Sequence, residues 1–168
     1  AWFHQLPNFD VDGMVGFFRR HGLDPARADT LFHRGPTYRG RVDGLPTEYR
    51  RLIEDDLVRI GGKDWRVIVG YGHSPEHASL YCAELNVLIS GDMLLPRIST
   101  NVSAMSSNPD GDPLGWFLDS VERLTELPED TLVLPSHGRP FRGIHARAAQ
   151  LAAHHEERFE ALLAVLDT

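Results

Sequence analysis

The sequence has few of the features that mark secreted, membrane-bound or disulfide-stabilised proteins. It contains one cysteine, Cys82, so no internal disulfide can form, and this residue in an apolar stretch is expected to fill the core. The most apolar run, residues 161–166, is far shorter than the roughly 20 residues that a membrane span requires. No charged start followed by an apolar stretch marks a signal peptide. We therefore predict a cytoplasmic protein with no membrane partner.

Positive charge is also scarce. The chain has 17 Lys and Arg against 24 Asp and Glu, a formal net charge of −7, and both signs are interspersed along the sequence. A protein that binds a polyanion usually shows a basic stripe or patch. We therefore predict no nucleic-acid partner. The 168 residues, 42% of them hydrophobic, are enough for one ordinary domain with a core, and we expect a single domain over 1–168.

The first third of the chain is predicted to be helical. Apolar residues in 10–21 follow helical spacing and Gly22 stops the helix. A second short helix is expected from Asp24 to near Gly35, with Pro25 in its first turn, and 36–47 is expected to be an irregular loop. We interpret residues 1–50 as a helical segment that lies over an active site as a lid.

The remainder, 55–168, alternates short strands with longer helices. Four runs rich in Val, Ile, Leu and Tyr predict an antiparallel meander whose first turn is Gly61-Gly62. These runs are 56–60, 64–71, 78–82 and 86–89. A helix over 114–124, a strand over 131–134 and a helix over 144–166 complete the prediction. In the last helix, Leu151, Phe159, Leu162 and Leu163 form an apolar side.

Three side chains that can bind metal ions come directly after predicted strands. They are His73 in Gly72-His73-Ser74-Pro75-Glu76-His77, Asp92 in Ser90-Gly91-Asp92, and His137 in Pro135-Ser136-His137. A short loop at a strand end can aim such side chains into a cleft. Imidazole nitrogen and carboxylate oxygen are ligands that Zn²⁺ and similar ions accept, and a carboxylate can bridge two ions. Taken singly, each is more often a hydrogen-bonded structural residue or a turn former than a ligand.

Together these motifs resemble the later motifs of the metallo-β-lactamase superfamily, in particular its glyoxalase-II-like members. The resemblance covers roughly Leu57 to the C-terminus and implies the second half of an αββα sandwich, an α/β fold with an antiparallel or mixed sheet flanked by helices. It also implies that His73 binds the first metal, that Asp92 bridges both, and that His137 binds the second. His77 matches the second histidine of its motif, which we interpret as an outer-shell residue that orients a ligand.

The family's leading motif, His-x-His-x-Asp-His, is absent from the 168 residues. Without it, each ion would keep one histidine and a share of Asp92, whereas zinc sites use three or four protein ligands. The chain also opens at Ala1, followed by the large apolar Trp2 and Phe3. We therefore expect a truncated form that binds metal weakly or not at all. Its exposed sheet is expected to form a homodimer or a strand-exchanged oligomer.

For the intact parent, the resemblance implies a hydrolase of a small-molecule ester, thioester or lactone. Two zinc ions, or iron or manganese in their place, would supply the nucleophile as bound hydroxide and would polarise the scissile bond. Arg97, Ser99 and Asn101 are candidates for substrate binding, and Arg139 and Arg142 have similar standing; a solvated loop is the alternative for all of them. A non-catalytic binding module on the same scaffold and a nuclease stay open as alternative functions.

Overall fold

The computed structural model describes residues 11–27, 48–104 and 108–166. The chain divides into two compact units, Ala1–Arg51 with Ala104–Gly111, and Leu52–Ser103 with Asp112–Thr168. The assignment of the whole chain to a single domain stays a prediction. No helix in the described ranges is both long and apolar enough to span a membrane.

The described part of the first unit centres on one amphipathic helix. Helix α1 covers Val11–Arg20, close to the predicted 10–21. Gly22 has φ of +90°, and the Leu23 N–H returns to the Phe18 carbonyl at 2.9 Å, a glycine-dependent helix end. Of the second predicted helix, residues 25–27 are helical. Its remainder and the loop 36–47 lie outside the described residues, so the lid stays a prediction.

The second unit is built on a five-stranded mixed sheet in the order β1-β2-β3-β4-β5. Its strands are β1 Leu57–Ile60, β2 Lys63–Gly70, β3 His77–Cys82, β4 Val87–Gly91 and β5 Leu132–Pro135. The first four strands pair antiparallel, whereas β5 pairs parallel with β4. The predicted meander and the α/β fold class are therefore confirmed, with strand ends within two residues of those expected.

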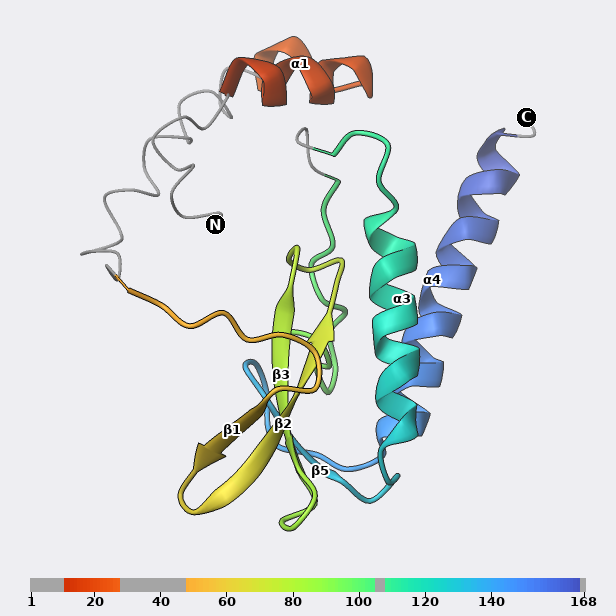
Figure 1. Ribbon diagram of the computed structural model, residues 1–168. Coiled ribbons are helices and arrows are strands. Elements are labelled where there is room, and N and C mark those ends of the chain that lie inside the picture. Colours follow the sequence, from red (N-terminus) through yellow and green to blue (C-terminus); the bar gives the residue numbers. More distant parts are fainter. Residues whose placement is uncertain (1–10, 28–47, 105–107, 167–168) are drawn as a thin grey trace. The chain divides into compact units, whose positions relative to one another are not determined.

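The parallel pairing of β5 follows from the long connection that precedes it, because parallel neighbours need a crossover. This connection contains helix α3, Pro113–Arg123, and a 3₁₀ turn, η3, Leu124–Glu126. Asp112 begins α3 by accepting the Gly115 N–H at 2.8 Å, and Pro113 occupies the first turn, where its missing N–H costs nothing. Helix α4, Ile144–Leu166, runs antiparallel beside α3, and both lie on one side of the sheet (Figure 1).

The core of this unit lies between one face of the sheet and these two helices. The buried cluster contains, from the sheet, Ile68, Tyr81, Leu88 and Val133, and from α3, η3 and α4, Phe117, Val121, Leu124, Ile144, Ala148 and Leu151. Tyr81 pairs with Leu88 and Leu88 pairs with Val133, so these side chains share one face. Ile68 pairs with Ser79, two positions from Tyr81, and therefore lies on the same face. Cys82 is fully buried and has no disulfide partner, as expected.

The opposite face of the sheet carries apolar residues outside this core. The cross-strand row Val67, Leu80, Ile89 and Leu134 follows from the pairing register. Val67 is buried, but Ile89 is 37% exposed and Leu80 and Leu134 are half-buried. None of these four residues belongs to the buried cluster on the other face of the sheet.

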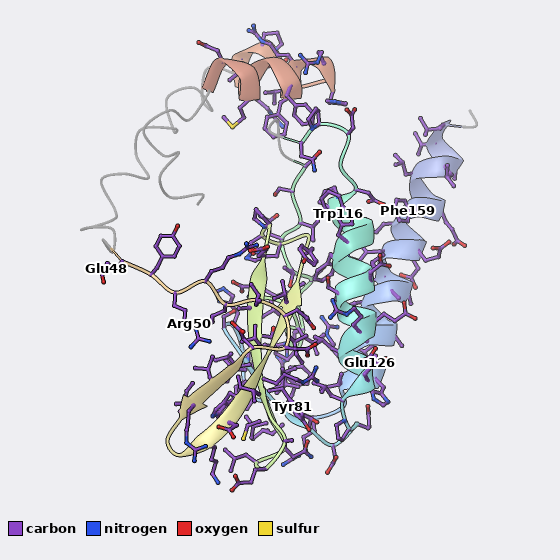
Figure 2. All side chains as sticks on the ribbon, viewed as in Figure 1. Glu48, Arg50, Tyr81, Trp116, Glu126 and Phe159 are labelled. Carbon is purple, nitrogen blue, oxygen red and sulfur yellow. The ribbon has the colours of Figure 1, made fainter. Side chains whose placement is uncertain are left out.

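Helix α4 differs from its predicted apolar side in its second half. Leu151 is 2% exposed, whereas Phe159, Leu162 and Leu163 are 45%, 57% and 59% exposed. Figure 2 labels Phe159 on this part of α4 and Trp116 on the first turns of α3. The periodicity of the sequence identified the apolar side, but the described elements of the unit cover it only as far as Leu151.

Candidate metal centre

The strand directions bring three loops to one end of the sheet. Strands β2, β4 and β5 run the same way, because β3 is antiparallel to both β2 and β4 and β5 is parallel to β4. Their carboxyl ends therefore share one edge, and His73, Asp92 and His137 follow these ends closely. Strand β3 runs the opposite way, so its first residue, His77, starts at the same edge.

The carboxylate of Asp92 lies between the two imidazoles. Its Oδ2 atom is 3.4 Å from Nε2 of His73, and its Oδ1 atom is 3.4 Å from Nε2 of His137. Each oxygen thus faces a different histidine. This arrangement places one carboxylate where it can share two cations, as a bridging carboxylate does.

The hydrogen bond at Nδ1 of His73 indicates which ring nitrogen carries the proton. Nδ1 lies 2.9 Å from the backbone carbonyl of Asn101, and a carbonyl only accepts, so Nδ1 carries the proton. In the neutral imidazole, the lone pair of Nε2 then faces Asp92. A backbone carbonyl that orients a metal-binding histidine in this way is a common outer-shell partner.

Asp92 accepts hydrogen bonds at both its side chain and its main-chain carbonyl. The Ser136 hydroxyl donates to Oδ1, and the Thr100 hydroxyl donates to the Asp92 carbonyl. The pKa of Asp92 is lowered from its ordinary value, first because of the Ser136 hydrogen bond and then because His73 and His137 lie nearby. Asp92 is therefore ionised at neutral pH and available to a cation.

His77 supports the same loop from beneath. The Asp92 N–H donates to its Nε2 at 3.2 Å, so Nδ1 holds the proton, and this buried Nδ1 has no partner among the described residues. Gly91, at φ of +53°, packs so closely that an added Cβ would lie 2.6 Å from Nε2 of His77. Burial, and then His73, lower the pKa of His77. His77 contacts the Asp92 backbone as an outer-shell residue would, although that role stays a prediction.

The predicted substrate-binding residues differ in whether their side chains already have a partner in the structure. The Ser99 hydroxyl lies 3.2 Å from Nε2 of His155 on α4, so it has a structural partner. Asn101 contributes its backbone carbonyl to His73, and its side chain is exposed. Arg97 and Arg139 line a cavity beside His137, whereas Arg142 donates instead to the Asp130 carbonyl. Their binding roles stay predictions.

The donor set fits a divalent metal, but incompletely. Two ligands about 2.1 Å from one tetrahedral zinc ion lie about 3.4 Å apart, which matches both of the distances from Asp92 to the histidines. These residues thus offer two donors for each of two ions. Within the described ranges, no group of three or more His, Cys, Asp or Glu side chains converges as a metal site requires. Further ligands are needed to hold either ion firmly.

Sequence reasoning missed three contributors: the Ser136 hydroxyl, the Thr100 hydroxyl and the Asn101 carbonyl. Ser136 immediately precedes His137, and a hydroxyl at that position was a signal that could have been used. The Asn101 carbonyl left no signal, since every residue has one and only the fold brings this one to His73. Gly91 was noted within Ser-Gly-Asp, but its contact with His77 was not.

Comparisons with known proteins identify relatives in sequence and in fold. A structure of a beta-lactamase domain protein from Burkholderia ambifaria is 50% identical and has a TM-score of 0.71, with 85% of this chain and 40% of that one covered. A metallo-beta-lactamase family protein from Thermus thermophilus is 30% identical with a TM-score of 0.79, over 96% of this chain and 50% of that one. A hydroxyacylglutathione hydrolase from Rhodospirillum rubrum is 33% identical over 60% of this chain and 36% of that protein.

The chain therefore spans two fifths to one half of these two solved proteins. The sequence model described as "Metallo-beta-lactamase superfamily" matches residues 12–137, about three quarters of the chain. It includes all three candidate ligands and ends at His137. On the motifs, the sheet and this match, the chain belongs to the metallo-beta-lactamase superfamily.

Proposed function

We propose that this chain carries one half of a dinuclear metal centre in a metallo-hydrolase that cleaves an ester, thioester or lactone. The observation that carries the proposal is the Asp92 carboxylate, whose two oxygens face His73 and His137 at equal distances. The similarity to a hydroxyacylglutathione hydrolase supports the ester and thioester class, and similarity to a probable metallo-hydrolase from Bacillus subtilis supports hydrolysis more broadly.

In this proposal, His73 and Asp92 hold one ion, and Asp92 and His137 hold the other. Zinc is the expected metal because its ligands are imidazole and carboxylate, and iron or manganese would accept the same donors. When bound, such ions supply Lewis-acid polarisation of the scissile carbonyl and activation of water. The chain's own residues act by orientation: Asn101 fixes the tautomer of His73, and the Ser136 hydroxyl holds Asp92 and lowers its pKa.

The test is the metal content of the whole protein together with its esterase activity. We expect a metal-loaded wild type that hydrolyses 4-nitrophenyl esters, and we expect a His73→Ala, His137→Ala double variant to lose both metal and activity. The exposed His154 on α4 provides the matched control, because His154→Ala removes an imidazole away from the three loops. Equal metal in wild type and double variant would overturn the ligand assignment. A wild type free of metal would favour a non-catalytic binding module.

A further inference from the structure

A cavity of about 670 Å³ opens beside His137, and two loops form its walls. The lining residues are Pro96, Arg97 and Ile98 from one loop and His137, Gly138, Arg139, Pro140 and Phe141 from the other. The volume is within the range of small-molecule sites, which lie between about 300 and 1,000 Å³. Among these lining residues, His137 is the candidate metal ligand, and Arg97 and Arg139 carry positive charge.

Both walls are held in place by contacts outside the cavity. The Arg147 side chain, from α4, donates to the carbonyls of Leu95 at 2.6 Å and Ile98 at 3.0 Å. The second loop is closed at its base by two backbone hydrogen bonds between Val133 and Phe141, of 2.8 and 3.1 Å. The cavity thus lies between anchored segments.

The two walls also touch each other at a glycine. Gly138 has φ of +90°, and a Cβ there would lie 2.7 Å from Cγ of Pro96. A side chain at this position would push the loops apart. The close approach brings Arg97 and Arg139, one from each loop, to the same cavity.

The charge of the cavity is opposite to that of the chain. The net charge of the protein is −7, yet the lining contains two arginines and no carboxylate. Both guanidinium groups are exposed, and neither has a hydrogen bond or ion pair with any other described residue. Guanidinium groups bind carboxylate and phosphate through paired hydrogen bonds. Ile98 and Phe141 add apolar surface to the lining of the same cavity.

We propose that this cavity, which we call the arginine pocket, binds an oxyanion of the substrate, a carboxylate or a phosphate joined to the scissile ester by a short apolar segment. The inference rests on the proposed function, since it assumes that the scissile group lies at His137 and Asp92. It adds a substrate class: the substrate is acidic, and Arg97 and Arg139 select it.

The kinetic test compares two esters of similar size in the metal-loaded whole protein. Mono-4-nitrophenyl glutarate carries a terminal carboxylate, and 4-nitrophenyl pentanoate carries none. We expect wild type to prefer the glutarate ester in kcat/KM, and we expect an Arg97→Gln, Arg139→Gln double variant to reduce that preference about tenfold or more. Arg59→Gln is the control for loss of a positive charge, because Arg59 lies in the exposed β1–β2 hairpin. An unchanged preference in the double variant would overturn the proposal.

A binding measurement separates this proposal from the proposed function. Glutarate and inorganic phosphate are titrated separately into wild type and the double variant, and the backbone amide shifts of residues 97, 98, 137–139 and 141 are followed by NMR. We expect shifts in wild type that disappear in the double variant, and the stronger of the two anions identifies the source of the oxyanion. Such shifts without hydrolysis of either ester would support the arginine pocket while the hydrolase proposal fails. Shifts that persist in the double variant, or none in wild type, would overturn the arginine pocket.

Discussion

At the scale of single residues, the candidate centre depends on how tightly Gly91 packs beside Asp92. Gly91 and His77 are packed against each other, and His77 accepts the Asp92 N–H. The position of the carboxylate is thus determined by a glycine whose role is geometric and by a histidine whose role is to accept a hydrogen bond. Both contributions can be measured.

Gly91→Ala should destabilise the protein and displace Asp92. The alanine methyl would lie 2.6 Å from Nε2 of His77, and the backbone there is left-handed, which costs a residue with a Cβ about 1–2 kcal/mol. Gly61→Ala is the matched control, because Gly61 has φ of +61° and nothing within 4 Å of an added Cβ.

We expect the free energy of unfolding, measured in urea, to fall in both variants because both place a Cβ on a left-handed backbone. Only Gly91→Ala should lose about 1–3 kcal/mol more, from overpacking. Metal affinity should fall in Gly91→Ala and stay at the wild-type value in Gly61→Ala. Equal losses of stability in the two variants would show that His77 moves aside without cost.

Ser136→Ala should raise the pKa of Asp92 toward its ordinary value. The Ser136 hydroxyl is the largest cause of the lowered pKa, with His73 and His137 contributing less. A carboxyl whose folded pKa is depressed stabilises the fold above its unfolded pKa, and this stabilisation is lost as pH falls through the folded pKa. In Ser136→Ala, the stabilisation above the unfolded pKa should therefore be smaller, and its loss on acidification should be complete at a higher pH.

The measurement is the carbon-13 carboxyl titration of Asp92 by NMR in metal-free protein, together with urea unfolding between pH 5 and pH 2. Ser103→Ala is the control for removal of a hydroxyl outside these contacts. A titration of Asp92 that does not move in Ser136→Ala would contradict the assignment of its main cause.

At the scale of elements, α4 has two different roles along its length. Its first half closes the core through Ile144, Ala148 and Leu151, and it directs Arg147 to the loop after β4. Its second half projects apolar side chains into solvent. The element that buries the sheet thus also holds one wall of the arginine pocket.

Arg147→Lys should loosen the loop 95–98 while leaving the helix intact. The arginine reaches two carbonyls with two separate nitrogens, and burial lowers its pKa. A lysine has a single nitrogen on a flexible chain and cannot reproduce this fork. We expect amide hydrogen exchange in residues 97–101 to become about tenfold faster, since hydrogen bonds from a charged group contribute about 1.5–3 kcal/mol. Arg158→Lys, exposed on the same helix, should leave this exchange unaltered; acceleration in both variants would argue against a local effect.

At the scale of the whole molecule, the two faces of the sheet differ in burial among the residues that the structure describes. Helices α3 and α4 bury Ile68, Leu88 and Val133, while Ile89 on the opposite face is 37% exposed. Apolar rows of this kind usually pack against another layer or another chain. The predicted homodimer or strand-exchanged oligomer is consistent with this face and stays a proposal.

The 168-residue chain should therefore self-associate through this face. We expect a sedimentation-equilibrium mass above the 18.9 kDa of one chain, and an Ile89→Thr, Leu134→Thr double variant should shift it toward 18.9 kDa. Val165→Thr is the control, because Val165 is 69% exposed on α4 and lies off the sheet. A monomeric wild type, or a shift caused by Val165→Thr alone, would exclude this face as the contact.

Local patterns in the sequence were sufficient for most of the secondary structure. Helix α1, the four-stranded meander and helix α4 were predicted to within two residues, because hydrophobic periodicity and glycine turns act over a few neighbours. The motifs around His73, Asp92 and His137 also indicated the family, since each joins a strand to a short loop with characteristic residues. These features needed no knowledge of the fold.

Only the tertiary structure decided what these residues do to one another. The parallel alignment of β2, β4 and β5 directs three loops separated in sequence to one edge, and the fold alone brings the Asn101 carbonyl to His73 and Arg97 to the cavity shared with Arg139. The covered length of α4 was likewise invisible in its periodicity, because periodicity identifies an apolar side but not its partner. Contacts between distant segments depend on how strands pair and helices pack. The spacing of residues within one segment determines neither.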